Sequence, residues 1–223
     1  MVQSAKDVLE RLVDSNWEIL VINDGSTDKT AALTLKLSND DSRIKLISHK
    51  KNMGFGCSVR TGIEQSSKEW IFYTDCDGQF DLNELEQVWE RRIGIDIVSA
   101  FRHKRKDPAM RLVYSFLWNT LTLMFFLRGF KDVDASFKLF RASIFDKVKP
   151  ESTCGVIDFE ILTLARNMGC KIIQIPVSHY NRRAGSVSFE SMRVGFIALV
   201  KFSAIYEMFH QLVAFRIRTW RGI

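Results

Sequence analysis

The sequence lacks the features that mark several large classes of protein. Four cysteines occur, at Cys57, Cys76, Cys154 and Cys170, but no CxxC pair, so we expect the reduced thiols of a cytosolic protein rather than a zinc site or a disulfide framework. The N-terminal stretch has no apolar core of the signal-peptide kind. No run of about 18 residues is apolar without interruption, which argues against a membrane span. There is no internal repeat and no low-complexity linker.

What is present fits one globular domain with an appendage. The chain has 223 residues and an ordinary share of apolar side chains, enough for a sizeable core. Its net charge of +6 favours anionic partners such as phosphates, nucleic acid or an acidic membrane surface, without choosing among them. We expect a main domain over residues 1–188 and an amphipathic helical tail over 189–223 that lies on a membrane surface.

Apolar runs alternate with helical segments along the first half of the chain. The runs are continuous, which predicts strands buried on both faces and therefore an α/β fold, with a mostly parallel sheet between two layers of helices. We expect strands at 18–22, 44–48, 70–74 and 95–100, and helices at 5–14, 28–38, 57–66 and 82–91. Ligands of such sheets bind beyond the carboxyl ends of the strands.

The second half mixes basic loops with apolar segments. Residues 101–111 and 181–189 are basic, and the uncharged apolar segment 112–127 predicts a buried or interfacial helix. We then expect a loop with a strand, an amphipathic helix and a further strand, over residues 131–145, 155–169 and 170–180. From Met192 onward the spacing of apolar residues predicts helix.

The segment DCDGQFD, residues 75–81, directly follows the strand expected at 70–74. Asp75 and Asp77 share one face of an extended chain, where their charges repel unless a cation lies between them. Mg²⁺ and Mn²⁺ are held by one or two carboxylates together with substrate phosphate oxygens, which matches this spacing. A solvated acidic turn is the alternative, but the position of the pair after a buried strand favours a metal–diphosphate site.

Two further strand ends carry polar or glycine-rich segments. In NDGSTD, Asp24 could accept hydrogen bonds from a base or ribose, although helix capping by Ser26, Thr27 and Asp28 explains the rest of the segment. In HKKNMGFG, backbone N–H groups around Gly54 could hold phosphate oxygens, a signal that is weak alone. All three segments end strands of one sheet, so we expect them to meet at one edge.

Charged residues flank the apolar segments. Arg102 follows a strand end and Arg111 precedes segment 112–127, where an arginine suits a lipid phosphate because it binds two oxygens at once. Arg182 repeats this arrangement. Glu160 lies beside the apolar stripe of the helix expected at 155–169, where it could pair with an arginine or face the site.

Taken in order, these segments resemble the inverting glycosyltransferases of the GT-A fold, and more narrowly the dolichyl-phosphate mannose/glucose synthase group with its bacterial polyprenyl-phosphate relatives. The matching segments are EILVINDGSTDKT, NMGFGCSVRTGI, FYTDCDGQFDLNEL, VSAFRHKRKDPAMR, DVDASFKLFR, GVIDFEILTLA and HYNRRAGS. The resemblance implies a Rossmann-like GT-A domain that transfers a sugar from a GDP- or UDP-sugar to a polyprenyl phosphate, with inversion and with Mg²⁺ or Mn²⁺. It implies no nucleic-acid partner.

The resemblance also implies roles for individual residues. Asp75 and Asp77 would bind the metal and the donor diphosphate, with Gln79 near the donor sugar. Arg111 would act with these three in catalysis. The other matches would bind substrate, with Asp24 at the nucleoside, Gly54 at the donor, Arg102 at the acceptor phosphate, and Asp134, Ser136, Lys138, Glu160 and Arg182 lining the site.

The first strand of the family, which ends in a Pro-x-Tyr-Asn-Glu type motif and helps to hold the nucleobase, has no counterpart here. The chain starts in what resembles the following helix, so we expect an N-terminally truncated domain in which that edge of the donor site is missing. We also expect a cytoplasmic protein bound peripherally at the cytoplasmic face of a membrane, because the lipid acceptor lies in a bilayer.

The possible transfer reactions differ in whether the acceptor must lose a proton. A phosphate monoester is largely ionised near neutral pH, because its second pKa is about 6, and so needs no general base. Transfer to a saccharide hydroxyl would need one, and Asp158 and Glu160 are the evident candidates. The segment DCDG also resembles the nucleophile loop of haloacid-dehalogenase-type phosphatases, although that loop normally follows the first strand. An inactive fragment is the remaining alternative.

Overall fold

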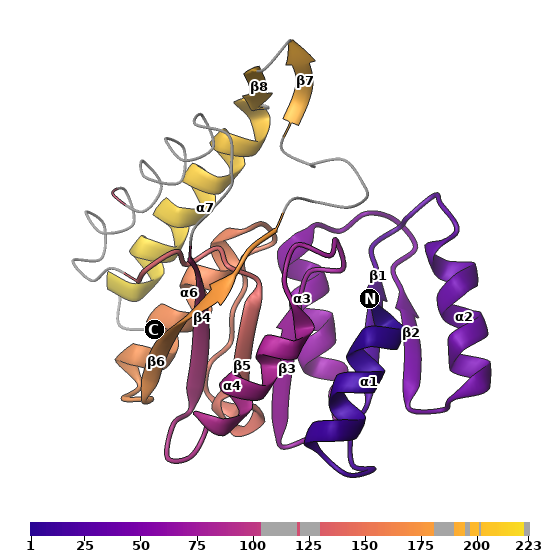
Figure 1. The fold of residues 1–223 in the computed structure, drawn as a ribbon. Helices are drawn as coiled ribbons and strands as arrows, with labels where there is room; N and C mark the ends of the chain where they lie inside the picture. Colours follow the sequence, from indigo (N-terminus) through magenta and orange to yellow (C-terminus); the bar gives the residue numbers. More distant parts are fainter. Residues whose placement is uncertain (104–119, 121–129, 181–189, 195–196, 201, 221–223) are drawn as a thin grey trace.

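The first 74 residues of the protein contain three helices and three strands, which alternate along the chain (Figure 1). The computed structural model describes residues 1–103, 120, 130–180, 190–194, 197–200 and 202–220. The first elements are α1 (Val2–Leu12), β1 (Ile19–Asn23), α2 (Thr30–Asp40), β2 (Ile44–Ser48), α3 (Phe55–Gln65) and β3 (Trp70–Thr74). The strands predicted at 44–48 and 70–74 are confirmed to the residue, and the other elements begin and end within three residues of the predicted positions.

The next elements build a four-stranded sheet with β3. They are η1 (Leu82–Glu84), α4 (Leu85–Glu90), β4 (Ile97–His103), β5 (Phe137–Arg141), η2 (Ala142–Asp146), α6 (Val156–Asn167) and β6 (Ile172–Ser178). The strand order is β3-β5-β4-β6, and β1 pairs with β2 in a separate parallel sheet. β5 runs antiparallel to β3 and β4, whereas β4 and β6 are parallel. The larger sheet is therefore mixed, because the chain re-enters it from the edge at which β4 ends.

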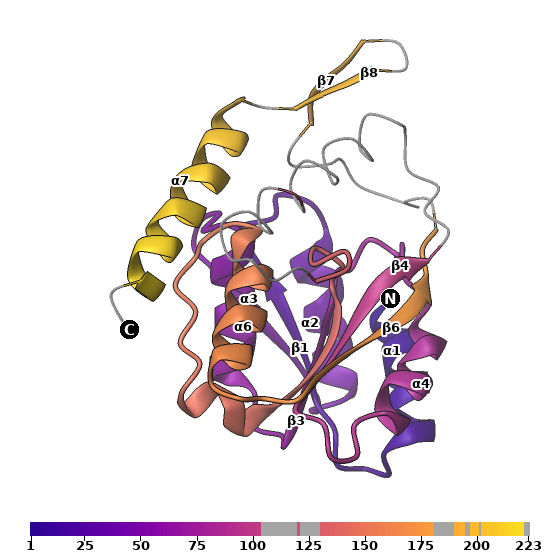
Figure 2. The ribbon, with the colours of Figure 1, turned by 90° about the vertical axis from the view of Figure 1, so that its left-hand side faces the viewer.

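Helices cover both faces of the sheets, as the continuous apolar strands predicted. Figure 2 shows α3 and α6 on one side and α1 and α4 on the other. One core cluster lies under α3 and α6 and includes Val59, Phe140 and Ile157. The other lies under α1 and α4 and includes Val8 and Val88. Burial on both faces explains why the strands carry few polar residues before their carboxyl ends.

The tail differs from the prediction. Residues 190–200 contain two antiparallel strands, β7 (Glu190–Val194) and β8 (Ile197–Val200), and the helix α7 begins only afterwards (Phe202–Trp220). The prediction of helix from Met192 was therefore wrong for residues 192–194 and 197–200. Val194, Ile197 and Val200 are β-branched and favour a strand, which a short window of apolar spacing does not distinguish from a helix. Within the described residues, no helix is both long and apolar enough to cross a membrane.

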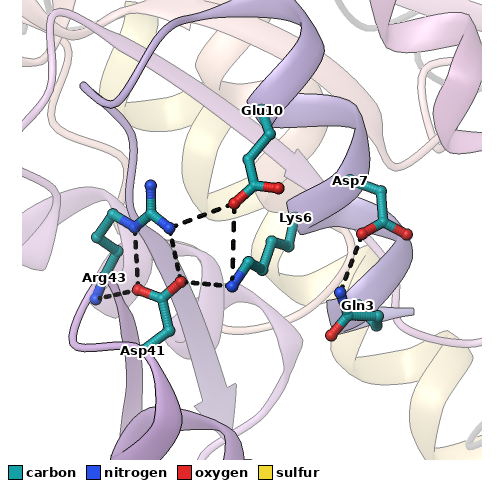
Figure 3. A network of polar contacts seen from close by, with 6 residues as sticks. All are labelled: Gln3, Lys6, Asp7, Glu10, Asp41 and Arg43. Atoms are coloured by element: carbon teal, nitrogen blue, oxygen red, sulfur yellow. Dashed lines mark hydrogen bonds and ion pairs between the residues drawn. The ribbon is translucent and has the colours of Figure 1, made fainter.

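Helix α1 is tied to the turn between α2 and β2 by a network of ion pairs (Figure 3). Asp41 lies at its centre and accepts hydrogen bonds from Lys6 Nζ at 2.8 Å and from Arg43 Nε and Nη2 at 2.9 and 2.7 Å. Arg43 also pairs with Glu10 at 3.3 Å and lies over the ring of Trp17. Arg43 above all, together with Lys6, holds the pKa of Asp41 well below its usual range. The network fixes α1 against the sheet of β1 and β2.

Candidate active site

The strand directions bring three segments to one edge of the four-stranded sheet. β3 and β4 end at this edge, and β5 begins there because it runs antiparallel to both. Thr74, the last residue of β3, pairs with Phe137, the first residue of β5. Residues just before β5 therefore lie beside those that follow β3, and the side chain of Ser136 hydrogen-bonds to Asp75. The acidic segment and Ser136, which the resemblance assigned to one site, are thus adjacent in the structure. The three segments predicted to end strands of one sheet do not share a sheet, because β1 and β2 pair apart from the sheet that contains β3.

The acidic pair directly follows β3. Gly78 turns the chain with a φ of 74°, and Asp77 Oδ1 accepts a hydrogen bond from Gln79 N at 2.9 Å. Burial, and then the charge of Asp77, raise the pKa of Asp75 to about 6. The carboxylates of Asp75 and Asp77 therefore repel each other, and either protonation of Asp75 or a cation bound between them would reduce this repulsion.

This pair fits a divalent cation that is shared with a substrate. In the part of the chain that the structure describes, no three His, Cys, Asp or Glu side chains gather as a protein-only metal site. Mg²⁺ and Mn²⁺ commonly take one or two carboxylates from a protein and complete their coordination with substrate phosphate oxygens and water. Asp75 and Asp77 supply carboxylates of that kind, one residue apart at the end of β3.

Gln79 joins the acidic segment to the end of β6. Its side chain is buried, and Nε2 donates to the carbonyl oxygen of Tyr180 at 3.1 Å, while Tyr180 N donates to Gln79 O at 2.8 Å. Phe80 forms an isolated antiparallel bridge with His179 beside it. In this structure Gln79 thus positions the acidic loop, and its predicted place near the donor sugar stays a prediction.

A buried polar network lies beneath the acidic pair. Lys138 on β5 is fully buried, and its Nζ lies 2.8 Å from Asp158 Oδ1 and 2.5 Å from the carbonyl oxygen of Ala135. Tyr73 hydrogen-bonds to the same carboxylate of Asp158. Burial and the charge of Asp158 raise the pKa of Tyr73 well above its usual value, so its hydroxyl remains a donor. Lys138 was predicted to bind substrate, but the structure places it in the core, as the partner of Asp158.

Arg102, at the end of β4, is held by a residue that the sequence analysis missed. Asp132 accepts from Arg102 Nε at 2.7 Å, from Nη2 at 2.5 Å and from the backbone N–H at 2.9 Å. Asp132 has a φ of 46°, a left-handed conformation that aspartate tolerates better than most residues. Its spacing from Asp134 repeats that of Asp75 and Asp77, and this was the available signal. Burial and the charge of Asp158 raise the pKa of Asp134 to about 6.

At the end of β1, Asp24 organises the glycine-rich loop. Its Oδ1 accepts from Met53 N at 2.8 Å and lies 2.7 Å from His49 Nδ1, and its Oδ2 accepts from Gly54 N at 2.9 Å. The other ring nitrogen of His49 lies 2.9 Å from Thr61 Oγ1. His49 was not predicted, although its place directly after β2 was a signal. The contact of Asp24 with a nucleoside stays a prediction.

The glycine-rich loop does not present its N–H groups as predicted. Gly54 N donates to Asp24, and Gly56 N donates to the carbonyl oxygen of Thr153 at 2.8 Å. Because these donors are bound within the protein, the structure does not support the predicted role of Gly54 in holding donor phosphate oxygens. Instead, Gly54 allows a φ of 95° and a close approach to residue 153.

Glu160 lies inside the protein. It is fully buried, its Oε2 accepts from Ser152 N at 2.8 Å, and its Oε1 pairs with Arg218 of α7. Of the two possibilities left open by the sequence, the structure shows the pairing with an arginine. Arg111 and Arg182 lie outside the described residues, and so does the predicted helix at 112–127 apart from residue 120.

A family model for glycosyl transferase family 2 matches residues 3–149, about two thirds of the chain. The chain belongs to glycosyl transferase family 2. Several proteins of known name are similar along most of this sequence. A dolichyl-phosphate beta-glucosyltransferase of Trichomonas vaginalis is 31% identical over 220 residues, which cover 92% of this chain and 66% of that protein. An undecaprenyl-phosphate 4-deoxy-4-formamido-L-arabinose transferase of Salmonella paratyphi B is 29% identical, covering 80% of this chain and 54% of that protein. The chain thus spans between about half and two thirds of the length of these relatives.

Solved structures of other proteins superpose on this chain and show that its fold is GT-A-like. Mannosyl-3-phosphoglycerate synthase from Rubrobacter xylanophilus superposes with a TM-score of 0.65 at 17% identity, covering 100% of this chain and 70% of that one. Glucosyl-3-phosphoglycerate synthase from Mycobacterium tuberculosis, solved with Mn²⁺ and UDP-glucose, has a TM-score of 0.59 at 16% identity, covering 96% and 72%. The predicted α/β fold class is therefore confirmed, and the family disfavours the phosphatase alternative.

Proposed function

We propose that this protein transfers a sugar from a nucleotide-sugar donor to a polyprenyl phosphate, with inversion and with a divalent cation, Mg²⁺ or Mn²⁺, at the acidic pair. The acceptor class is supported by the relatives named for dolichyl and undecaprenyl phosphate. The donor class and the cation are supported by the fold neighbour solved with Mn²⁺ and UDP-glucose. Membership of family 2 supports glycosyl transfer as the reaction.

The observation that carries the choice of a phosphate acceptor is the state of the two candidate general bases. Asp158 is 2% exposed and pairs with Lys138, and Glu160 is 0% exposed and pairs with Arg218. A carboxylate in a buried ion pair is a poor base, because taking up a proton would leave the buried cation unpaired. An ionised phosphate acceptor needs no such base.

In this mechanism the protein's own residues mainly bind and orient. Asp75 and Asp77 would hold the cation, which when bound neutralises charge on the departing nucleoside diphosphate. Asp132 fixes the guanidinium group of Arg102 in one orientation, and we assign Arg102 to the acceptor phosphate, which must be positioned against repulsion from the donor. Attack from the side opposite the diphosphate then inverts the anomeric centre.

The decisive test is transfer from UDP-glucose or GDP-sugars to a polyprenyl phosphate, with Asp134→Asn as the diagnostic variant. Asp134 is a carboxylate of this site with a pKa near neutrality, about 6, so it is the base to exclude. We expect Asp134→Asn to lower kcat by less than about tenfold, because loss of a true general base costs roughly 10²–10⁴-fold.

If kcat of Asp134→Asn falls by 10²-fold or more and the unaltered protein transfers sugar to saccharide hydroxyls, the phosphate acceptor is contradicted. Transfer to a saccharide hydroxyl, as in polysaccharide synthesis, is then the better hypothesis. Thermal melting with UDP or GDP and Mn²⁺ tests the inactive-fragment alternative independently. Neither nucleotide would shift the midpoint of such a fragment.

We also propose that the protein works as a peripheral protein at the cytoplasmic face of a membrane, with the outer face of α7 on the lipid. Four exposed apolar side chains at helical spacing form that face, Tyr206, Phe209, Ile217 and Trp220. Leu212 and Phe215, on the opposite face, are buried against the domain, and Arg216 adds a cation at the outer side. Aromatic and cationic side chains together suit the interface of an anionic bilayer.

Vesicle flotation tests this surface. The protein should float with anionic liposomes at low salt and be partly released at high salt, and Tyr206→Ser with Trp220→Ser should weaken flotation several-fold. Sedimentation of the unaltered protein at low salt would contradict the membrane proposal and favour a soluble acceptor.

A further inference from the structure

The C-terminal helix α7 reaches the glycine-rich loop through one short segment, residues 151–154, which we name the bridge loop. Gln211 on α7 holds this loop with its side-chain amide. Its Oε1 accepts from Thr153 N at 2.8 Å and from Cys154 N at 3.4 Å, and its Nε2 donates to Thr153 Oγ1 at 2.6 Å. A single side chain thus binds two successive backbone N–H groups and a hydroxyl, and these bonds hold the bridge loop in one position relative to α7.

The opposite side of the bridge loop contacts the glycine-rich loop, backbone against backbone. Gly56 N donates to Thr153 O at 2.8 Å. A Cβ added at Gly56 would lie 2.3 Å from Ser152 O, and one added at Gly54 would lie 2.6 Å from Thr153 O. The two backbones therefore touch without space for even a methyl group. A shift of the bridge loop must move the glycine-rich loop, because close-packed backbone has no slack to absorb it.

The base of this assembly is rigid. Glu160, buried in α6, accepts from Ser152 N at 2.8 Å and pairs with Arg218 of α7, which also pairs with Glu151. Phe215 of α7 packs edge-on against Phe159 of α6, with ring centroids 6.3 Å apart. Figure 2 shows α7 running along the side of the domain that carries α6. Helix α7 is thus docked by both apolar and charged contacts.

From these contacts we propose that Gln211 is a positioning residue for the nucleotide-sugar donor. It acts from α7 through the bridge loop on Met53 and Gly54, whose N–H groups bind Asp24. The proposal rests on the proposed function and on the predicted contact of Asp24 with the donor nucleoside. It makes donor affinity depend on the C-terminal helix, whereas the acceptor phosphate site at Arg102 does not share these contacts.

The test replaces Gln211 with leucine, which keeps the volume and removes every hydrogen bond to the bridge loop. Calorimetric titration with UDP and with GDP in the presence of Mn²⁺ should show a dissociation constant raised roughly tenfold, the loss of one to two net hydrogen bonds. The KM for the donor sugar should rise similarly, while kcat and the KM for polyprenyl phosphate change little. His210→Leu, the same kind of replacement at the adjacent exposed position, should leave nucleotide affinity unchanged.

Gln211→Glu keeps the acceptor for Thr153 N but loses the donor to Thr153 Oγ1 and faces Glu207, whose Oε1 lies 3.1 Å from Gln211 Nε2. We expect the nucleotide dissociation constant of Gln211→Glu to lie between those of wild type and Gln211→Leu. If the leucine variant fails to fold, Gln211→Glu provides the test. Wild-type nucleotide affinity in a folded Gln211→Leu protein, or in Gln211→Glu if leucine unfolds the chain, would overturn the positioning role. If wild type itself binds neither nucleotide, the proposed function fails instead, so the two failures are distinguishable.

Discussion

Replacing Asp77 with asparagine is expected to lower sugar transfer by roughly 100-fold or more, the size of effect seen when one preorganised electrostatic group is removed from an active site. The amide keeps the shape of the side chain, and its oxygen can still accept from Gln79 N, so the loop should keep its conformation. What is lost is one of the two charges that would hold the cation and, through the cation, the donor diphosphate. Burial, the main cause of the raised pKa of Asp75, remains in this variant, but the repulsion by residue 77 is lost, so that pKa should fall part of the way from about 6 toward the ordinary value.

The measurement is the rate of transfer at saturating donor, together with nucleotide binding at increasing Mn²⁺. Asp81→Asn is the matched control, because Asp81 is a carboxylate of the same segment whose Oδ1 accepts from Asn83 N at 3.0 Å at the start of η1. The control should lose a little stability and keep its activity. Normal turnover by a folded Asp77→Asn protein would refute the metal–diphosphate role of the pair.

Lys138→Met should destabilise the fold by about 3–5 kcal/mol, because it leaves the buried carboxylate of Asp158 without its cation. The hydrogen bond from Tyr73 remains but does not compensate a full charge. Equilibrium unfolding in urea measures the effect. Lys45→Met is the matched control, since Lys45 pairs with Glu18 at 2.8 Å but is half exposed, and it should cost no more than about 1 kcal/mol.

The double variant Lys138→Met, Asp158→Asn separates loss of the pair from general damage to the core. Removing the second charge should restore much of the lost free energy of unfolding, because no unpaired charge then stays buried. If the double variant loses as much free energy of unfolding as the two single variants together, the ion pair does not act as a unit. Since the network lies under Asp75, we expect donor binding to weaken in both single variants.

Much of the fold followed from local patterns. The strand at 70–74 is visible as an apolar run, and the strand at 44–48 as three apolar residues interrupted by one lysine. The acidic pair is visible because polar residues follow residue 74 at once. Such features depend on the burial of a few neighbouring residues, which the sequence displays directly. The same reasoning failed at residues 192–200, where short apolar spacing is compatible with either helix or strand.

Which charged groups meet was decided by the tertiary structure alone. The antiparallel direction of β5 brings Lys138 to Asp158 and Tyr73, and Asp132 to Arg102, across long separations in sequence. Likewise, the sequence left open whether Glu160 pairs with an arginine or faces the site, and the position of α7 beside the bridge loop decides for the pairing. A carboxylate that is a metal ligand, a general base or a buried ion-pair partner has the same local sequence signature. Its role depends on whether the fold places a cation, water or a substrate beside it, because burial and neighbouring charge set its ionisation.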